Sequence, residues 1–365
     1  MRGLLDASSV GGPIESAREL VMAHGWNATA YQIVNPGISL WFAQSMDAVV
    51  GYVDRGHTRV VAGAPVCAPQ RLAEVVAEFE HVCAREGRRV CYFGAEARLE
   101  TLLRADRGHA MVLLGAQPSW NPGQWSGIIQ SKASLRAQLN RSRNKGVTVS
   151  SLSAAEATGH PALRRVLAEW LATRGLPPMH FLVEPDTLAR LFDRRIFVAR
   201  SRTTEVVAFL VASPAPARSG WLIEQFVRGR EAPNGTVELL LDAAMRAFAS
   251  EGYNYVTLGL APLSRHGVPR ETNPPWLRLA LRWVRAHGRR FYNFEGLDTF
   301  KAKFQPERWE PVYAIVNRPR FSPGALYAIA AAFSDGSPVW TILRALWRAA
   351  RTELRWMRRR RLLRR

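Results

Sequence analysis

The feature that most constrains the fold is an order of segments that occurs twice along the chain. In the first half, strand-like runs separated by Gly, Pro and Asp precede an amphipathic helix at residues 71–86, and a buried strand follows at 90–93. In the second half, three strand-like runs between residues 196 and 227 precede a long helix at 235–252, and a strand follows at 255–258. This order predicts an α/β (α+β) fold of two similar units, each with a mixed, mostly antiparallel sheet flanked by helices. No residue-level repeat is present, so the duplication is predicted for the fold alone.

Other segments complete this plan. We predict further strands at 31–34, 40–43, 48–53, 58–62, 110–114 and 312–316, and further helices at 13–24, 99–104, 161–174 and 275–287. We expect three parts: an N-terminal unit over residues 1–150 that ends in a basic helix, a C-terminal catalytic unit over residues 151–320, and a basic amphipathic tail over residues 321–365. Hydrophobic residues make up 47% of the chain, which is enough for two packed units.

The charge of the chain favours a polyanionic partner. The formal net charge is +20, and residues 341–365 contain ten Arg and one Glu, so a charge of +11 remains on the rest of the chain. Part of that remainder lies at 131–146, where a basic helix would bring five cations together: Lys132, Arg136, Arg141, Arg143 and Lys145. We predict that this helix contacts phosphates of RNA or of lipid head groups. The alternative is a solvated helix face.

Several kinds of chemistry find no support in the sequence. The three cysteines, Cys67, Cys83 and Cys91, match no zinc spacing and lie in apolar surroundings, and the histidines show no metal-ligand pattern. Neither a Walker nor a Rossmann glycine motif is present, so we expect no cofactor and no metal. The N-terminal residues lack the apolar stretch of a signal peptide, and no run of about 18 apolar residues predicts a transmembrane helix. We therefore expect a cytoplasmic protein.

The C-terminal segment has the pattern of a helix that lies on a membrane surface. Within residues 341–365, apolar residues such as Ile342, Leu346 and Trp347 recur at helical spacing, while arginines lie largely on the other sides of the helix. Each Arg near an anionic leaflet adds about 1 kcal/mol of binding. We expect the protein to be peripheral on the inner face of the cell membrane, with anionic phospholipid as a partner. A helix packed on the protein itself is the alternative.

Two segments of the second half place polar residues around the start of the long helix. Glu224 and Arg228 lie at the end of a predicted strand, and the turn Pro233-Asn234-Gly235 opens the helix that contains Glu238. A helix start offers free N–H groups to an anion. A plain strand–turn–helix connection would have the same sequence.

Two further segments follow that helix. Gly259 allows a tight turn at the carboxyl end of a predicted strand, where ligands usually bind in α/β sheets, and Ser264 comes shortly after it. In residues 291–313, Lys301 and Lys303 stand among aromatic residues. Core packing explains the aromatic residues, whereas stacked bases beside phosphate-binding lysines would explain both residue types.

Together these segments resemble the catalytic domain of the lysylphosphatidylglycerol synthases, the multiple peptide resistance factor family. The resemblance rests on Glu224 to Arg228, on Pro233-Asn234-Gly235 with Glu238, on residues 252–264 (GYNYVTLGLAPLS) and on residues 294–313 (FEGLDTFKAKFQPERWEPVY). It implies two tandem acetyltransferase-like (GNAT) units, in a stand-alone form without the flippase part of that family. The sequence departs from the family pattern at Gln225, where an acidic residue is usual, which leaves the amino acid that is transferred open.

The resemblance also implies a reaction. A lysine-like aminoacyl group would move from aminoacyl-tRNA to a hydroxyl of a membrane lipid such as phosphatidylglycerol, in an ester exchange that needs no ATP. The carboxylates would bind the ammonium group of the amino acid or supply a base, the cations would bind the tRNA end or the lipid phosphate, and the small residues would shape the pocket. The expected catalytic residues are Glu224, Arg228 and Glu238, and the expected substrate-binding residues are Asn234, Gly235, Gly259, Ser264, Lys301, Lys303, Arg141 and Lys145.

Two alternatives stay open. The first is a GNAT-type transferase with another donor or acceptor, such as acyl-coenzyme A or the peptidoglycan precursor of the Fem-type ligases, although the usual coenzyme A loop is not evident. The second is a non-catalytic RNA- or membrane-binding relative. Alanine at Glu224, Arg228 or Lys301 separates them, because loss of lipid product with membrane binding intact favours the transferase.

Overall fold

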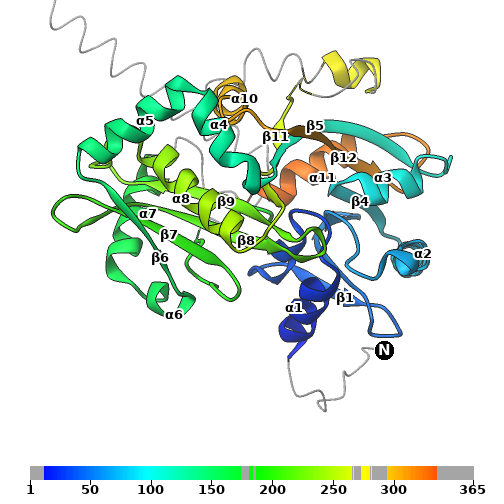
Figure 1. The fold of residues 1–365 in the computed structure, drawn as a ribbon. Helices are drawn as coiled ribbons and strands as arrows, with labels where there is room; N and C mark the ends of the chain where they lie inside the picture. The colour runs from blue at the N-terminus through cyan, green and yellow to red at the C-terminus, as the bar shows by residue number, and fades with distance from the viewer. Residues whose placement is uncertain are drawn as a thin grey trace, which may run out of the picture.

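The computed structural model describes residues 12–173, 181–183, 186–264, 266, 273–279, 281 and 294–334 (Figure 1). In this part of the chain, twelve strands form one sheet in the order β1-β2-β3-β4-β12-β5-β10-β9-β8-β7-β6, with β11 paired to β5. The strands are β1 Ser39–Phe42, β2 Val49–Arg55, β3 Thr58–Ala62, β4 Arg89–Ala95, β5 Ala110–Trp120, β6 Thr148–Leu152, β7 Arg195–Arg200, β8 Val206–Ala215, β9 Gly220–Arg228, β10 Tyr255–Thr257, β11 Ala261–Pro262 and β12 Arg308–Val316. The α-helices are α1 Pro13–His24, α2 Leu72–Arg85, α3 Ala97–Leu103, α4 Trp125–Ser131, α5 Ala133–Asn144, α6 Ala154–Ala157, α7 Pro161–Ala172, α8 Thr236–Ser250, α10 Phe294–Ala302 and α11 Pro323–Phe333, and the 3₁₀ helices are η1 Ala30–Val34, η2 Pro69–Arg71, η3 Pro122–Gln124 and η4 Pro216–Arg218.

The two halves of the sheet share one plan. In the first half, β1, β2 and β3 are antiparallel neighbours, α2 follows, and β4 returns parallel to β3. In the second half, β7, β8 and β9 are antiparallel neighbours, α8 follows, and β10 returns parallel to β9. The mixed, mostly antiparallel sheet and its two similar halves confirm the predicted fold class. The boundaries proposed for the three parts stay a prediction.

The last strand of each half crosses over to the other half (Figure 1). β5 follows β4 along the chain but pairs antiparallel with β10, and β12 comes after β10 and β11 but pairs antiparallel with β4. These two strands also pair with each other, from Arg308 opposite Ser119 to Val316 opposite Ala110. Because β5 and β12 exchange in this way, the sheet continues through the junction and leaves no unpaired strand edge there.

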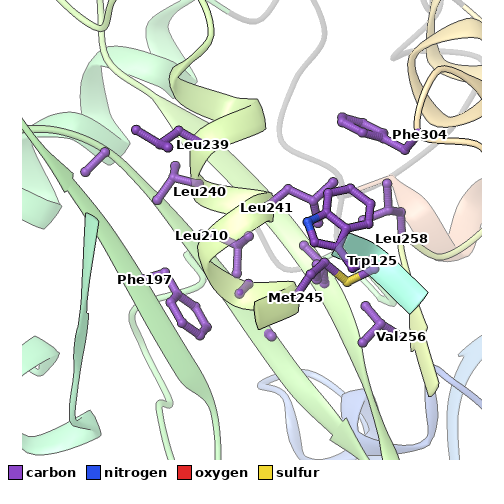
Figure 2. Packing of buried hydrophobic residues seen from close by; sticks show 14 of the residues in the cluster. Trp125, Phe197, Leu210, Leu239, Leu240, Leu241, Met245, Val256, Leu258 and Phe304 are labelled. Carbon is purple, nitrogen blue, oxygen red and sulfur yellow. The ribbon is translucent and has the colours of Figure 1, made fainter. Parts of the chain in front are cut away.

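Helices cover both faces of the sheet, because alternate residues of each strand point to opposite sides. In β7, Ile196 and Val198 pack with α7, whereas Phe197 and Ala199 pack with α8. The α8 face is the larger core, and Figure 2 shows Trp125 of α4 inserted there beside Met245 of α8. In the first half, α2 and α3 cover one face, and α1, η1 and α11 cover the other.

Most predicted segments are confirmed within a few residues, because their apolar spacing matches the face that is buried. The helix predicted at 71–86 is α2, with Val75, Val76 and Phe79 in the core. The helix predicted at 235–252 is α8. The strand predicted at 110–114 is longer, since β5 continues to Trp120 through the junction of the two halves.

The strand predicted at 31–34 is wrong. These residues belong to η1, in which every side chain is buried. Three N–H groups of this stretch, those of Ala30, Gln32 and Asn35, bond to the carbonyl three residues earlier. The backbone polar groups therefore find partners locally and need no neighbouring strand. A short buried apolar run has the same sequence pattern in either conformation.

Two predicted helices lie partly or wholly outside the described residues. The helix predicted at 275–287 is described only at 275–279 and 281, which are helical, and the amphipathic helix predicted at 341–365 is not described. Among the described helices, none has the length and apolar character needed to cross a membrane. In the same part of the chain, no group of three or more His, Cys, Asp or Glu side chains is placed to hold a metal ion.

Candidate functional site

The carboxyl end of β9 leads through a short turn into α8. Arg228 at this strand end donates from Nη2 to the Ala232 carbonyl oxygen at 2.7 Å and to Asn234 Oδ1 at 3.2 Å. Both Arg228 and Asn234 are exposed. The guanidinium thus closes the turn and remains accessible, which is compatible with the predicted contact to a phosphate.

Gly235 lets α8 begin directly against the basic helix α5. Its φ of +95° lies in the left-handed region, and an added Cβ would lie only 2.2 Å from the Gln138 carbonyl oxygen of α5. The hydroxyls of Ser142 in α5 and Thr236 in α8 lie 3.4 Å apart. Glycine is therefore required by packing, and this packing brings α5 beside the start of α8.

The cations of α5 divide into two kinds. Arg143 donates to the buried Asp242 at 2.9 Å, and the other oxygen of that carboxylate accepts from Trp125 Nε1 at 2.9 Å. Arg141 and Lys145 are exposed, and no carboxylate of the described residues forms an ion pair with either. One arginine of α5 therefore stabilises the fold, while two other cations face solvent next to α8.

Glu238 in the first turn of α8 forms an ion pair with Lys303, which follows α10. Lys303 Nζ lies 2.6 Å from Glu238 Oε1, and the two side chains are 32% and 13% exposed. The same ammonium lies 4.3 Å from the centroid of the Phe300 ring, and Phe226 of β9 packs edge-on against Phe300. The end of β9, the start of α8 and the end of α10 therefore meet at this ion pair.

Lys301 has a different environment from Lys303. Its Nζ is buried and donates to three backbone carbonyl oxygens, those of Leu258 at 2.8 Å, Gly259 at 2.7 Å and Leu260 at 2.9 Å. Burial lowers the pKa of Lys301 to about 7, against a smaller opposing effect of the Asp298 carboxylate. Three acceptors match the three N–H bonds of an ammonium group. Lys301 therefore holds the chain in place after β10, which differs from the direct substrate contact that the sequence predicts.

The turn after β10 contains the other small residues of the predicted site. Gly259 has a φ of +68°, and its N–H donates to Thr257 Oγ1 at 3.0 Å. Ser264 is buried, and its Oγ accepts from the His266 N–H at 3.2 Å. These contacts give Gly259 and Ser264 structural roles in the turn, and their predicted contribution to a pocket stays a prediction.

Glu224 points into the protein because β9 has an irregular register at this position. Val211 of β8 lies opposite Gln225 and the next residue lies opposite Ile223, so Glu224 is an extra residue in the strand. Its carboxylate forms a buried ion pair with Arg194 at 2.7 Å, and Arg194 also donates to Asn35 at 2.7 Å.

The predicted site residues therefore fall into separate groups. One group surrounds the start of α8 and contains Arg228, Asn234, Gly235, Glu238 and Lys303, with Arg141 and Lys145 on the adjoining helix. Lys301, Gly259 and Ser264 belong to the turn after β10. Within the described residues, Glu224 bonds to neither group and instead joins the second half to the segment around η1 through Arg194.

The predictions from the sequence did not include a buried polar cluster that lies at the junction of the two halves. Arg218 of η4 donates from Nη2 to Glu310 at 2.6 Å and from Nη1 to Glu96 at 3.1 Å and to the Tyr255 hydroxyl at 3.0 Å. Burial raises the pKa of Glu96 to about 7, whereas hydrogen bonding and charge from Arg218 outweigh burial and lower the pKa of Glu310. The cluster joins the residue that follows β4 to strands β5, β10 and β12.

A signal for this cluster exists in the sequence. Gln117 and Ser119 lie on the same face of β5 and interrupt an otherwise apolar strand, and both donate to the Glu310 carboxylate, at 3.2 and 3.3 Å. Buried polar side chains in a strand need partners, so these two residues predict a polar neighbour. The sequence does not say that the partner comes from residue 310.

Comparisons with known proteins agree with this architecture. The sequence model of the family described as "Phosphatidylglycerol lysyltransferase, C-terminal" matches residues 18–316. The phosphatidylglycerol lysyltransferase of Staphylococcus aureus strain MRSA252 is 24% identical over 310 residues, and that of Staphylococcus haemolyticus is 21% identical over 314 residues. Each alignment covers 84% of this chain but only 36% of the relative, so the chain spans about a third of the length of these proteins.

Solved structures show the same fold. The C-terminal domain of a putative lysylphosphatidylglycerol synthetase from Agrobacterium fabrum has a TM-score of 0.73 at 24% identity, covering 88% of this chain and 97% of that chain. L-PGS from Bacillus licheniformis has a TM-score of 0.73 at 22% identity, covering 90% and 98%. Since the family model matches well over half of the residues, the chain belongs to the phosphatidylglycerol lysyltransferase C-terminal family.

Proposed function

We propose that this protein transfers a lysine-like aminoacyl group from aminoacyl-tRNA to a hydroxyl of a membrane lipid such as phosphatidylglycerol. The observation that carries the proposal is the family match over residues 18–316, in which the relatives are named phosphatidylglycerol lysyltransferases. The geometry at the start of α8 supports it, because carboxylate, guanidinium and ammonium groups meet there in a partly exposed position.

The Glu238–Lys303 pair suits the recognition of an aminoacyl group. The ammonium of an incoming amino acid competes for the Glu238 carboxylate, and Lys303 is then free to bind an anionic oxygen. Partial exposure makes this exchange accessible, since Lys303 is 32% exposed. Arg228 and the first turn of α8 add positive potential on the same side.

The transfer itself exchanges one ester for another. The lipid hydroxyl oxygen attacks the carbonyl carbon of the aminoacyl ester and loses its proton, and the ribose oxygen of the tRNA leaves and gains one. One ester bond forms while another breaks, so the atoms balance without ATP. In this assignment, the positive charges of Lys303 and Arg228 stabilise the oxyanion that develops between these events. Glu238 holds the amino group, and Lys301 acts indirectly by fixing the turn at 258–260.

The basic helix α5 supports tRNA as the donor. Arg141 in α5 and Lys145 directly after it are exposed, and α5 touches the start of α8 at Gly235. Cations on one helix face beside a transfer site are suited to the phosphates of an acceptor stem. We further propose that the protein works at the cytoplasmic surface of the membrane, because its acceptor is a lipid.

The test is a reconstituted transfer reaction. The purified chain is incubated with labelled lysyl-tRNA and phosphatidylglycerol vesicles, and label is measured in the extracted lipid, with and without prior RNase treatment. We expect RNase-sensitive label in the lipid. Substitution Glu238→Gln should lower the transfer rate by about 100-fold, on the scale of a lost charged contact in a transition state. The matched control is Glu251→Gln, at the other end of α8, where the exposed pair with Arg195 has no part in the proposal.

Each other outcome has a defined meaning. If the lipid is labelled and Glu238→Gln and Glu251→Gln transfer at equal rates, the catalytic site does not lie at the start of α8. Transfer of an acyl group from coenzyme A, or to a peptidoglycan precursor instead of the lipid, makes the chain a transferase of another kind. If no donor is consumed while tRNA or vesicles still bind, the protein is a binding module.

Donor recognition has its own measurement. The variant Arg141→Ala, Lys145→Ala should weaken tRNA binding and reduce the slope of log K against log salt by about 2, because each phosphate contact contributes about 0.9. The charge-matched control is Arg85→Ala, Arg164→Ala, with both residues exposed on other helices. An equal loss in the control would show that net charge alone attracts the RNA.

A further inference from the structure

Three arginines surround an open hollow at the point where β12 ends and the chain turns toward α11. The hollow has a volume of about 390 Å³ and is lined by Arg89, Arg318, Pro319, Arg320 and Ser322. All three arginines are exposed, and no acidic side chain contributes to the lining. Among the described residues, no carboxylate forms an ion pair with any of the three. The hollow therefore presents positive charge that the described part of the chain leaves unneutralised.

The backbone holds these arginines next to each other. The Asn317 N–H donates to the Val90 carbonyl oxygen at 3.2 Å, and Asn317 Oδ1 accepts from the Val90 N–H at 2.9 Å. This pair of bonds joins the residue after Arg89 to the residue before Arg318. Pro319 restricts the backbone on the other side of Arg318. The arginine side chains thus project from a fixed backbone, which needs no rearrangement when an anion binds.

The helix that follows has an outward face without charge. From residue 321 to residue 334 the sequence FSPGALYAIAAAFS contains no acidic or basic residue. α11 buries Ala325, Ala328 and Ile329 against the sheet, and its exposed residues are Pro323, Gly324, Tyr327 and Ala330. Tyr327 is 49% exposed. In a chain with 22% charged residues, an exposed apolar helix face directly beside three arginines is a distinctive surface.

We propose that the surface formed by Arg89, Arg318, Arg320 and the outward face of α11 docks the protein on an anionic phospholipid bilayer. The guanidinium groups bind lipid phosphates, and the apolar face with Tyr327 lies in the head-group layer. A nucleic acid would satisfy the arginines but would leave the apolar face without a partner. The chain continues from α11 into the segment with ten Arg at 341–365, whose charge adds to the same attraction.

This inference deepens the proposed function and rests on its lipid acceptor, but it concerns a separate place in the protein. β12 runs from Arg308, near α10, to Val316, next to the arginine hollow. Eight residue steps of about 3.3 Å place the two ends about 26 Å apart. Substitutions in the docking surface should therefore change membrane binding and leave the transfer chemistry intact.

The test measures binding of the full chain to vesicles by co-sedimentation, without any donor. Vesicles of phosphatidylcholine with 30% phosphatidylglycerol are compared with phosphatidylcholine alone at physiological salt. The variant Arg318→Gln, Arg320→Gln should bind the anionic vesicles about 30-fold more weakly, since each Arg contributes about 1 kcal/mol and 1.4 kcal/mol is tenfold. Tyr327→Ser should weaken binding several-fold. The charge-matched control Arg164→Gln, Arg202→Gln, in exposed residues of the second half, should change it less than threefold.

Three other outcomes would overturn the proposal. An equal loss in the control shows attraction by net charge alone. A loss of tRNA binding with vesicle binding intact makes the arginines an RNA surface. A change of oligomeric state or of protease sensitivity at the C-terminal segment after Tyr327→Ser, with vesicle binding intact, shows that a second copy or that segment covers α11. Transfer to detergent-dispersed lipid is measured in parallel. A variant that transfers to dispersed lipid but does not bind vesicles supports docking. A wild-type protein that is inactive on dispersed lipid counts only against the proposed transferase function and leaves the docking proposal standing.

Discussion

Lys301 and Lys303 stand one residue apart in the sequence, and the structure predicts that their removal has very different consequences. The Lys301 ammonium is buried and donates to three backbone carbonyl oxygens at 2.7–2.9 Å. The Lys303 ammonium is 32% exposed and forms one ion pair. Substitution by Met keeps most of the side-chain volume in both cases and removes only the charge and its bonds.

The expected costs follow from these contacts. In Lys301→Met, three carbonyls around the turn after β10 lose their donor, at about 1–3 kcal/mol for each buried acceptor left without one. Relief of the buried charge returns part of this, and we expect a net loss of about 3 kcal/mol. In Lys303→Met, the loss is at most about 1 kcal/mol, because partly exposed ion pairs contribute little. For a protein of this size, about 2 °C per kcal/mol gives a fall in Tm of about 6 °C for the first variant and about 2 °C or less for the second.

The assay is thermal unfolding followed by calorimetry and circular dichroism for the wild type and both variants in one buffer. Transfer activity measured on the same samples separates stability from function, since Lys303→Met should lose activity with its fold intact. A Lys301→Met protein that melts within 2 °C of the wild type would refute the reasoning that these carbonyls depend on the ammonium. Equal shifts for both variants would refute it as well.

Three further predictions concern buried groups. Burial raises the pKa of Glu96 from 4.5 to about 7, so between these pH values the folded protein keeps a proton that the unfolded chain releases. The free energy of unfolding should therefore fall by up to about 3 kcal/mol as the pH rises from 4.5 to 7. Glu96→Gln should flatten this part of a plot of the urea midpoint against pH. Gly235→Ala should lower the free energy of unfolding by more than about 2 kcal/mol, because a Cβ would lie 2.2 Å from a carbonyl oxygen of α5. Gly252 also has a positive φ but open space around it, so Gly252→Ala should cost only about 1 kcal/mol. Similar melting temperatures of the two variants would contradict this difference. Glu224→Gln should lower the free energy of unfolding by about 3–5 kcal/mol, because Arg194 stays buried without its carboxylate. Adding Arg194→Met should restore part of this loss. A double variant that is less stable than Glu224→Gln alone would argue against a buried ion pair.

The secondary structure of segments with a regular burial pattern could be predicted from the sequence. The helices α2 and α7 follow from local periodicity, because each buries one face and exposes the other. The same reasoning fails at η1, where every side chain is buried and the pattern carries no period. The exchange of β5 and β12 between the halves could not be predicted, since strand pairing depends on contacts about 200 residues apart.

The sequence named residues for the candidate site but did not give their arrangement. Glu238 and Lys303 were both named from the sequence, and their ion pair places them together. Glu224 and Lys301 were named beside them, yet one forms a buried pair with Arg194 and the other binds backbone carbonyls. Each pair contains one glutamate and one lysine, so residue type does not separate the pairs; only the tertiary structure shows that Glu238 and Lys303 are partly exposed whereas Glu224 and Lys301 are buried.

The sequence by itself determined the two similar units, the excess of positive charge and the motifs that mark the family, because these depend on residue order and composition. Only the tertiary structure decided which charges remain accessible. A register irregularity in β9 buries Glu224, and the approach of α5 to Gly235 places exposed cations beside α8. The start of β4 and the segment after β12 together present three arginines next to an uncharged helix. Each of these depends on contacts between distant segments, which local sequence patterns do not contain.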